Sequence, residues 1–429
     1  MAETQLHLLK SRRFLPLFIT QFLGAVNDNL LKTALVTLVT YRTFTDPTTT
    51  KIVVAIATAI FIAPYFIASA TAGQLADKVE KAGLIRAVKL WEVGVMVLAA
   101  AGFGLGGEAF VAFELAVLLL LGVQATFFGP VKYGILPELL GREDLMGGNA
   151  LVEAGTFLAI LLGTIAGGLL ILLPGGEAIV STALLAFALA GWAASRLIPR
   201  SRGAAPDLRI NPNIWAETLA IIRFARERRE LWLSILAISW FWLVGAVFLS
   251  QFPTYAKDTL GANADVETLF LAMFSVGIGA GSILCGRLLR GEVSARLAPL
   301  GAFGMAVFSL DLYGVSARIG SGGGALIGIG DFLSHAADWR LLADLFLISA
   351  CGGLFTVPLY ALLQARSEES HRSRVVAANN VLNALFIVVS GALSAVMLKL
   401  GLTVPQIFLA VGLANTGAAL LVLRLRKAG

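Results

Sequence analysis

The chain has 429 residues, of which 58% are hydrophobic and 14% are charged, and its mean hydropathy is +0.84. A soluble globular domain carries roughly 25% charged residues, so this composition excludes an ordinary soluble protein and predicts a polytopic membrane protein. The formal net charge of +6 does not indicate nucleic-acid binding. Lys and Arg gather in short segments between apolar stretches, where the cytoplasmic side of a membrane protein collects them.

Twelve apolar stretches each reach the length of about 20 residues that a helix needs to cross a membrane. We therefore expect an all-α integral membrane protein with twelve transmembrane helices in two six-helix bundles. The predicted units are an amino-terminal bundle at 1–200, a basic cytoplasmic linker at 201–229 and a carboxy-terminal bundle at 230–429. The predicted spans are 14–41, 52–76, 86–106, 109–136, 146–173, 177–198, 231–256, 266–288, 296–314, 340–364, 373–398 and 403–423.

The distribution of Lys and Arg predicts the orientation of these spans. With both termini in the cytoplasm, the cytoplasmic segments hold most of the 33 basic residues, and the linker between the halves is especially rich in arginine. The opposite orientation would need the reverse bias. The first ten residues lack the apolar core and cleavage site of a signal peptide, so we expect the first helix to be retained.

The two halves resemble each other in sequence. FGPVKYGIL at 128–136 is similar to FTVPLYALL at 355–363, and GNALVEA at 148–154 is similar to ANNVLNA at 378–384. Pro, Tyr and Asn match in the same order, which chance similarity between two Ala- and Leu-rich segments does not explain. Parallel repeats of six helices are typical of transporters that hold their substrate between the halves, near the middle of the membrane.

Among the ionisable residues inside predicted spans, three are the main candidates for a substrate site: Asp28, Lys132 and Glu153. An ionised side chain in hydrocarbon costs at least about 2.5–3.5 kcal/mol, so it marks a functional site by default. A purely structural role remains open for each. Asp28 could pair with Lys32, one turn away, and Lys132 could pair with Glu153 or Asp28. Glu153 could bond to Asn149, one turn earlier. Polar residues that would line the same cavity are Asn29, Lys32, Gln124, Asn149, Asn379 and Asn383.

The segment GQLADKVEK at 73–81 lies between the second and third predicted spans. It resembles the loop G-x-L-a-D-(R/K)-x-G-(R/K) of the major facilitator superfamily, although Glu80 stands where the family usually has glycine. The resemblance implies a cytoplasmic latch, in which glycine allows close helix contact and the acidic and basic side chains hold a gate closed. A solvated run of charges is the alternative. The candidate gate residues are Gly73, Asp77, Lys78 and Lys81.

Four stretches are similar to the lysophospholipid transporter (LplT) branch of this superfamily: QFLGAVNDN at 21–29, GPVKYGILPEL at 129–139, GNALVEA at 148–154 and VPLYALLQ at 357–364. The chain departs from that branch at Tyr360, where asparagine is expected, and in the seventh span, which lacks an arginine. These departures concern which lipid head group the transporter accepts. The transporter also occurs fused ahead of acyltransferase and acyl-ACP synthetase domains, so the chain could be the transporter part of such a fusion.

The resemblance implies a monomeric transporter that flips lysophospholipid across the bacterial inner membrane by alternating access, supplying an acyltransferase inside. Such a cargo combines a phosphate, an amine or glycerol, and one acyl chain. Lys132 would meet the phosphate, while Asp28 and Glu153 would meet an ammonium group or Lys132 itself.

Two other classes of function are weighed against this one. A proton-coupled drug or small-solute antiporter usually carries G-x-x-x-G-P-x-x-G-G in its fifth span, but GTIAGG at 163–168 has no proline. A membrane enzyme would need a catalytic pair on one face of the membrane, and the histidines lie in loops or the tail. Cys285 and Cys351 are typical of small buried residues. We therefore expect no catalytic site, no cofactor and no metal.

Overall fold

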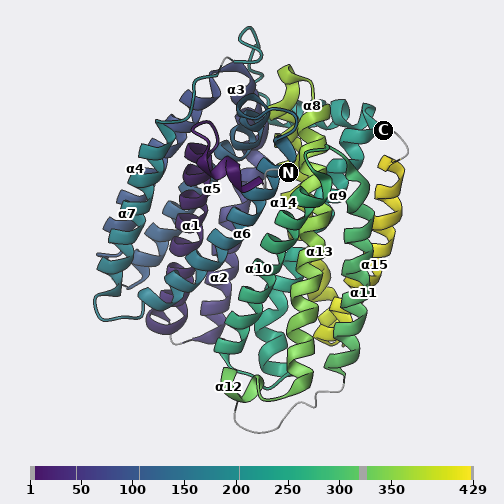
Figure 1. The fold of residues 1–429 in the computed structure, drawn as a ribbon. Coiled ribbons are helices and arrows are strands. Elements are labelled where there is room, and N and C mark those ends of the chain that lie inside the picture. The colour runs from purple at the N-terminus through teal and green to yellow at the C-terminus, as the bar shows by residue number, and fades with distance from the viewer. Residues whose placement is uncertain (1–4, 45, 106, 202, 318–325, 427–429) are drawn as a thin grey trace.

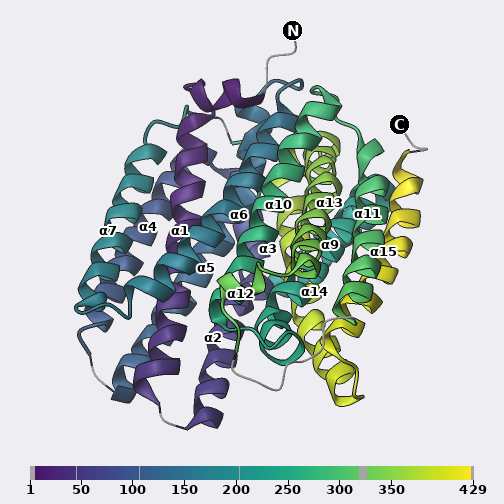
Figure 2. The same cartoon turned by 60° about the horizontal axis from the view of Figure 1, so that its bottom comes forward.

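The computed structural model describes residues 5–44, 46–105, 107–201, 203–317 and 326–426. Within these ranges the protein is helical, apart from one isolated β-bridge between Ala262 and Ile327. Two groups of long helices stand side by side, with the purple-to-blue first half on the left and the teal-to-yellow second half on the right (Figures 1 and 2). The described fold is therefore the all-α arrangement that the composition predicts.

The first group contains the helices that precede the central linker. They are α1 (Leu15–Leu38), α2 (Pro47–Ile67), α3 (Ser69–Lys78), α4 (Lys81–Gly102), α5 (Gly107–Leu139), α6 (Leu145–Leu170) and α7 (Gly176–Ser195). The second group follows the linker. It contains α9 (Arg229–Thr254), α10 (Ala264–Leu289), α11 (Ala298–Ser316), the short α12 (Ile329–Phe332), α13 (Ala336–Arg366), α14 (Arg372–Lys399) and α15 (Val404–Arg426).

Eleven of the described helices are long and apolar enough to cross a membrane. The twelfth long helix of the bundles, α4, has 22 residues but holds Arg86, Lys89 and Glu92 along its length. Charged residues at the centre of a span are costly, so α4 needs partners for them inside the protein. Together these helices account for the twelve predicted spans.

The second predicted span, at 52–76, is not one continuous helix. It is interrupted at Ala68, where α2 ends and α3 begins, and the Ala68 amide donates to the carbonyl of Pro64 at 2.7 Å. Pro64 lies inside α2, one turn before this break, and a proline inside a helix bends the chain. Beyond the break, α3 packs against α14.

The linker contains a helix that the sequence analysis did not predict, α8 (Ile214–Glu227). The side chain of Asn213 caps it by accepting from the Ala216 amide at 3.0 Å, as N-cap residues do. Thr218, Ile221 and Ala225 recur on one face and are buried, against α3, α9 and α14. This spacing is the signal in the sequence that could have revealed the helix.

The stretch before α8 is attached to the amino-terminal bundle. The Asn211 amide donates to Gln74 Oε1 at 2.7 Å, and Gln74 Nε2 donates back to the Asn211 carbonyl at 3.3 Å. The Ala205 amide also donates to the carbonyl of Asp77 at 2.9 Å. The linker therefore lies along α3 and connects it to α8 and the second bundle.

Helices α10 and α13 meet at glycines. A Cβ atom on Gly281 would collide with the carbonyl of Ala350, and one on Gly353 would lie 2.6 Å from the Ser282 amide nitrogen. Lipid chains are as apolar as leucine, so helices in a membrane associate mainly through close van der Waals packing, which small residues permit. These glycines let the two backbones approach and fix the crossing of the pair.

We expect Gly281→Ala to destabilise the protein by about 1–3 kcal/mol, because the new methyl group overpacks a backbone contact. The control is Gly279→Ala, two residues away in α10, where a Cβ atom would make only an ordinary contact with Ala154 at 3.8 Å. Thermal unfolding of the purified variants measures the difference. Equal midpoints for the two variants would contradict the tight crossing.

Candidate functional site

Asp28 lies near the middle of α1, and it is partly buried. Its Oδ1 atom accepts no hydrogen bond from a described residue. Lys32, the partner that the spacing suggested, instead donates to Asn29 Oδ1 at 3.2 Å and lies 5.7 Å from the centroid of the Phe61 ring. No ion pair within 4.0 Å joins Asp28 to any described cation, so local pairing does not neutralise it.

Lys132 and Glu153 come from α5 and α6 and lie close to Tyr133. The Lys132 Nζ atom is 4.7 Å from the centroid of the Tyr133 ring, and the Tyr133 hydroxyl donates to Glu153 Oε2 at 3.4 Å. Glu153 is 2% exposed, and its Oε1 atom has no hydrogen-bond partner among the described residues. Charge interactions connect Lys132 with both Glu153 and Asp28. Three charges from α1, α5 and α6 thus converge without a direct ion pair between them.

An aromatic contact joins the two bundles beside these charges. The rings of Tyr133 and Tyr360 stack with centroids 4.7 Å apart and planes 5° from parallel. Trp242 Nε1 donates to the Tyr360 hydroxyl at 3.1 Å, and Phe157 stacks on Trp242 at 6.2 Å. Tyr360 and the seventh span were the two departures from the lysophospholipid transporter pattern, and here they contact each other directly.

The predicted polar lining residues have different environments. Asn149 exchanges two hydrogen bonds with Gln364, at 2.9 and 2.8 Å, so its amide is used in holding α6 to α13. Asn383 accepts from Ser239 at 2.9 Å. Asn379 is fully buried, and its side chain bonds to Tyr360, as does that of Asn383. All three amides therefore have partners among the described residues.

A buried ion pair inside the first bundle was missed by the sequence analysis. Lys89 and Glu92, both from α4, are at most 1% exposed and form an ion pair. Glu92 also accepts from Gln124 Nε2 at 3.0 Å and from Asn27 Nδ2 at 3.4 Å. Lys and Glu three residues apart in an apolar span are the signal that could have found this pair. Gln124, predicted as cavity lining, is part of this network.

The candidate gate residues lie where α3 meets the first turn of α14. Asp77 is fully buried and accepts from the Ser373 amide at 2.9 Å, the Arg374 amide at 3.2 Å and Arg374 Nε at 3.2 Å. Burial raises the pKa of the Asp77 carboxyl, and these hydrogen bonds partly oppose that shift. A Cβ atom on Gly73 would lie 2.7 Å from that of Ala377, so glycine permits the close approach.

The other residues of this loop bind elsewhere. Lys81 is fully buried, and its Nζ atom forms an ion pair with Glu138 Oε1 at 2.6 Å, within the first bundle. Lys78 makes no ion pair with a described residue. Glu80, at the position that is usually glycine, pairs with Arg86 at 3.0 Å and accepts from the Ser201 amide at 3.2 Å. Among the four candidates, Gly73 and Asp77 therefore contact the second bundle directly.

The protein has two helical bundles, buried charged and polar side chains inside the first bundle, and hydrogen bonds and stacked rings between the bundles. This arrangement is that of a multi-pass membrane protein of the transporter class. A sequence model of the Major Facilitator Superfamily matches residues 17–318. In structure, the chain is similar to the human organic anion transporter MFSD10 (TETRAN), with a TM-score of 0.71 and 14% identity, covering 97% of this chain and 98% of that one. The chain belongs to the major facilitator superfamily.

Within the superfamily, two curated relatives share one name. The chain is 31% identical over 400 residues to a "Lysophospholipid transporter LplT" of Salmonella heidelberg (strain SL476), covering 91% of this chain and 87% of the relative. It is 30% identical over 369 residues to the protein of the same name from Serratia proteamaculans (strain 568), covering 84% and 82%. The likeness therefore extends along most of both chains, as the sequence motifs indicated.

We expect Glu92→Gln to destabilise the protein by about 3–5 kcal/mol, because it removes the direct ion-pair partner of the buried Lys89 ammonium. The double variant Lys89→Met with Glu92→Leu should recover most of this loss, since both charges are then absent. Equilibrium unfolding of the purified proteins measures both effects.

The control for this prediction is Glu177→Gln, which breaks the exposed pair between Glu177 and Arg42. Exposed pairs contribute about 0–1 kcal/mol, so this variant should unfold nearly as the unmodified protein does. If the Glu92→Gln protein were as stable as the Glu177→Gln protein, the buried ion pair would not stabilise the first bundle.

Proposed function

We propose that this protein transports lysophospholipid across the bacterial inner membrane by alternating access, with the two bundles rocking around a site near the middle of the membrane. The observation that carries the proposal is the group Asp28, Lys132 and Glu153. These three charges have no direct ion pair among the described residues, in a chain whose curated relatives are named lysophospholipid transporters.

The chemistry of the cargo fits these side chains. A lysophospholipid head group carries a phosphate, which would meet Lys132, and in ethanolamine lipids an ammonium group, which would meet Asp28. Charges in a cavity that water screens only partly interact more strongly than charges at a surface. The aromatic side chains of Tyr133, Tyr360 and Trp242 would supply an apolar wall, and the buried amide of Asn379 beside Tyr360 a hydrogen bond.

The proposal also includes the orientation of the transporter in the membrane, the direction of transport and the enzyme that receives the lipid. Both termini lie in the cytoplasm, because that orientation places most basic residues there. Lysophospholipid then moves inward from the outer leaflet, and an acyltransferase or acyl-ACP synthetase, separate or fused to this chain, re-acylates it inside. The transporter itself works as a monomer, since one chain supplies both bundles.

The contact of Asp77 with the first turn of α14 acts as the cytoplasmic latch. A carboxylate that accepts two backbone amides at a helix N-terminus is stabilised there by the helix dipole. Breaking the contact would separate α3 from α14, which the inward-open state requires. The pair Asn149 and Gln364 supports the same closed end, because it links α6 to α13.

Proteoliposomes with labelled lysophospholipid on one side test the function. We expect faster transfer than in protein-free vesicles, and loss of transfer for all phosphate-bearing lysolipids in Lys132→Ala. Asp28→Asn should impair lysophosphatidylethanolamine and spare lysophosphatidylglycerol, because only the former carries an ammonium group. Lys51→Ala, which removes an exposed lysine of α2, is the control and should transport normally.

Several outcomes of this assay would contradict the proposal. Transfer no faster than in empty vesicles, together with proton-coupled efflux of a drug, would favour an antiporter. If Lys132 is only structural, Lys132→Ala should instead lower thermal stability, and the exchange Lys132→Glu with Glu153→Lys should restore transport. Equal loss for both head groups in Asp28→Asn would reassign Asp28 to gating or ion coupling.

A latch at Asp77 predicts a separate effect. Asp77→Asn should slow transport while leaving equilibrium binding of lysophospholipid largely intact, because the latch stabilises one conformation and does not contact cargo. Distances between spin labels on the two bundles would measure the shift toward the inward-open state. Loss of binding with an unchanged distribution of distances would rule out the latch.

A further inference from the structure

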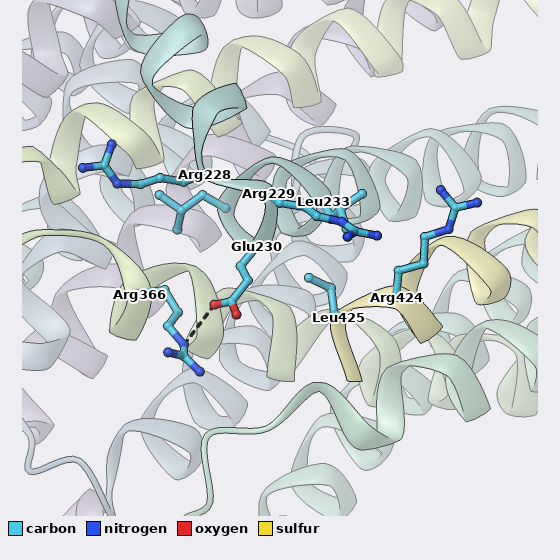
Figure 3. Close-up of a pocket in the computed structure, with 8 residues that line it drawn as sticks. Arg228, Arg229, Glu230, Leu233, Arg366, Arg424 and Leu425 are labelled. Carbon is cyan, nitrogen blue, oxygen red and sulfur yellow. Dashed lines mark ion pairs between the residues drawn. The ribbon is translucent and has the colours of Figure 1, made fainter. Parts of the chain in front are cut away.

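A pocket of about 350 Å³ lies at the end of the second bundle where α9 begins and where α13 and α15 end (Figure 3). This end of the molecule also carries α3, α8 and both chain termini (Figure 1). Four arginines and one glutamate line the pocket, which leaves an excess of three positive charges. The lining residues are Arg228, Arg229, Glu230, Leu231, Leu233, Arg366, Arg424 and Leu425.

The arginines fall into two pairs with different surroundings. Arg366 forms an ion pair with Glu230 at 3.1 Å, and Arg228 forms one with Glu368. Arg229 and Arg424 are exposed and make no ion pair with a described residue. Figure 3 shows these two on one side of Glu230, with Arg228 and Arg366 on the other. The uncompensated positive charge is therefore concentrated between α9 and α15.

The first turn of α9 adds to this positive potential. Its residues Arg229, Glu230 and Leu231 line the pocket, and Arg228 at the N-cap makes no side-chain capping bond. The first amides of a helix have no partner within the helix, and the dipole places partial positive charge there. Guanidinium groups beside a helix N-terminus are suited to a phosphate oxygen, which accepts from both.

The apolar surroundings distinguish a lipid from a soluble anion. Leu231, Leu233 and Leu425 form the rest of the pocket wall. Along α15, Leu420 is one turn before Arg424 on the same face and is 65% exposed, and Leu413, further along that face, is 52% exposed. An acyl chain could thus follow α15 into the membrane while its phosphate remains at the arginines.

We propose that this pocket binds the head group of an anionic phospholipid of the surrounding leaflet, with the phosphate held by Arg229, Arg424 and the first turn of α9. Basic pockets between helix ends on the cytoplasmic side are typical of such lipid sites. The site lies within the second bundle, away from Asp28, Lys132 and Glu153 of the first. It does not depend on which substrate the transporter carries.

The test compares thermal unfolding of the purified protein in neutral detergent with added phosphatidylglycerol, phosphatidylcholine or inorganic phosphate. Binding to the folded state raises the unfolding midpoint by mass action. We expect phosphatidylglycerol to raise it more than phosphatidylcholine does, and phosphate alone to have little effect. The double variant Arg229→Gln with Arg424→Gln should lose most of the rise specific to phosphatidylglycerol.

The matched control is Arg12→Gln with Arg13→Gln, which removes two exposed arginines near the amino terminus and should keep the full rise. Native mass spectrometry, counting bound phosphatidylglycerol, gives a second measurement if the pocket variant is less stable without lipid.

An unchanged rise of the unfolding midpoint and an unchanged lipid count in the pocket variant would overturn the proposal. A rise with phosphate equal to that with lipid would reduce the site to an anion site. No effect of lipid or phosphate would exclude a lipid site.

Discussion

Charge buried in an apolar environment is the constraint on which the arrangement of the first bundle depends. The protein meets it in two ways. Lys89 and Glu92 neutralise each other and are enclosed by Asn27 and Gln124, so this network is complete without a ligand. Asp28, Lys132 and Glu153 approach one another but form no direct ion pair. Because an uncompensated charge in the membrane is costly, this second group is suited to a ligand or water that changes during transport.

The contacts between the bundles explain how such a site can be closed at one end. Asp77 joins α3 to α14, Asn149 joins α6 to α13, and Tyr133 stacks on Tyr360. Helix α3, which carries Asp77, lies at the end of the molecule that carries the termini (Figure 1). Polar bonds and stacked rings at an interface can separate and re-form, whereas the close glycine crossing of α10 and α13 lies within the second bundle. The contacts between the bundles can therefore change during transport, while the helix crossing inside the second bundle stays fixed.

Much of the candidate site can be picked out in the sequence because charged residues are rare in membrane spans. Asp28, Lys132 and Glu153 stand out in apolar sequence, and the motif at 73–81 identified Asp77 and Gly73 beside a helix end. Lys89 and Glu92 were equally visible but were not singled out, because they lie near the predicted start of a span. The role of Asn149 could not be read from sequence, since its partner Gln364 is 215 residues away.

The sequence by itself determined the membrane environment, the all-helical fold and the family, because hydropathy and local motifs are properties of short segments. Only the tertiary structure decided which buried charges are neutralised. Lys32 bonds to Asn29 and not to Asp28, while Glu92 gathers partners from α1, α4 and α5. It also decided that arginines from the ends of α9, α13 and α15 line one pocket. Partners far apart in the chain meet through helix packing, and no pattern in a short segment of sequence predicts which helix faces will be in contact.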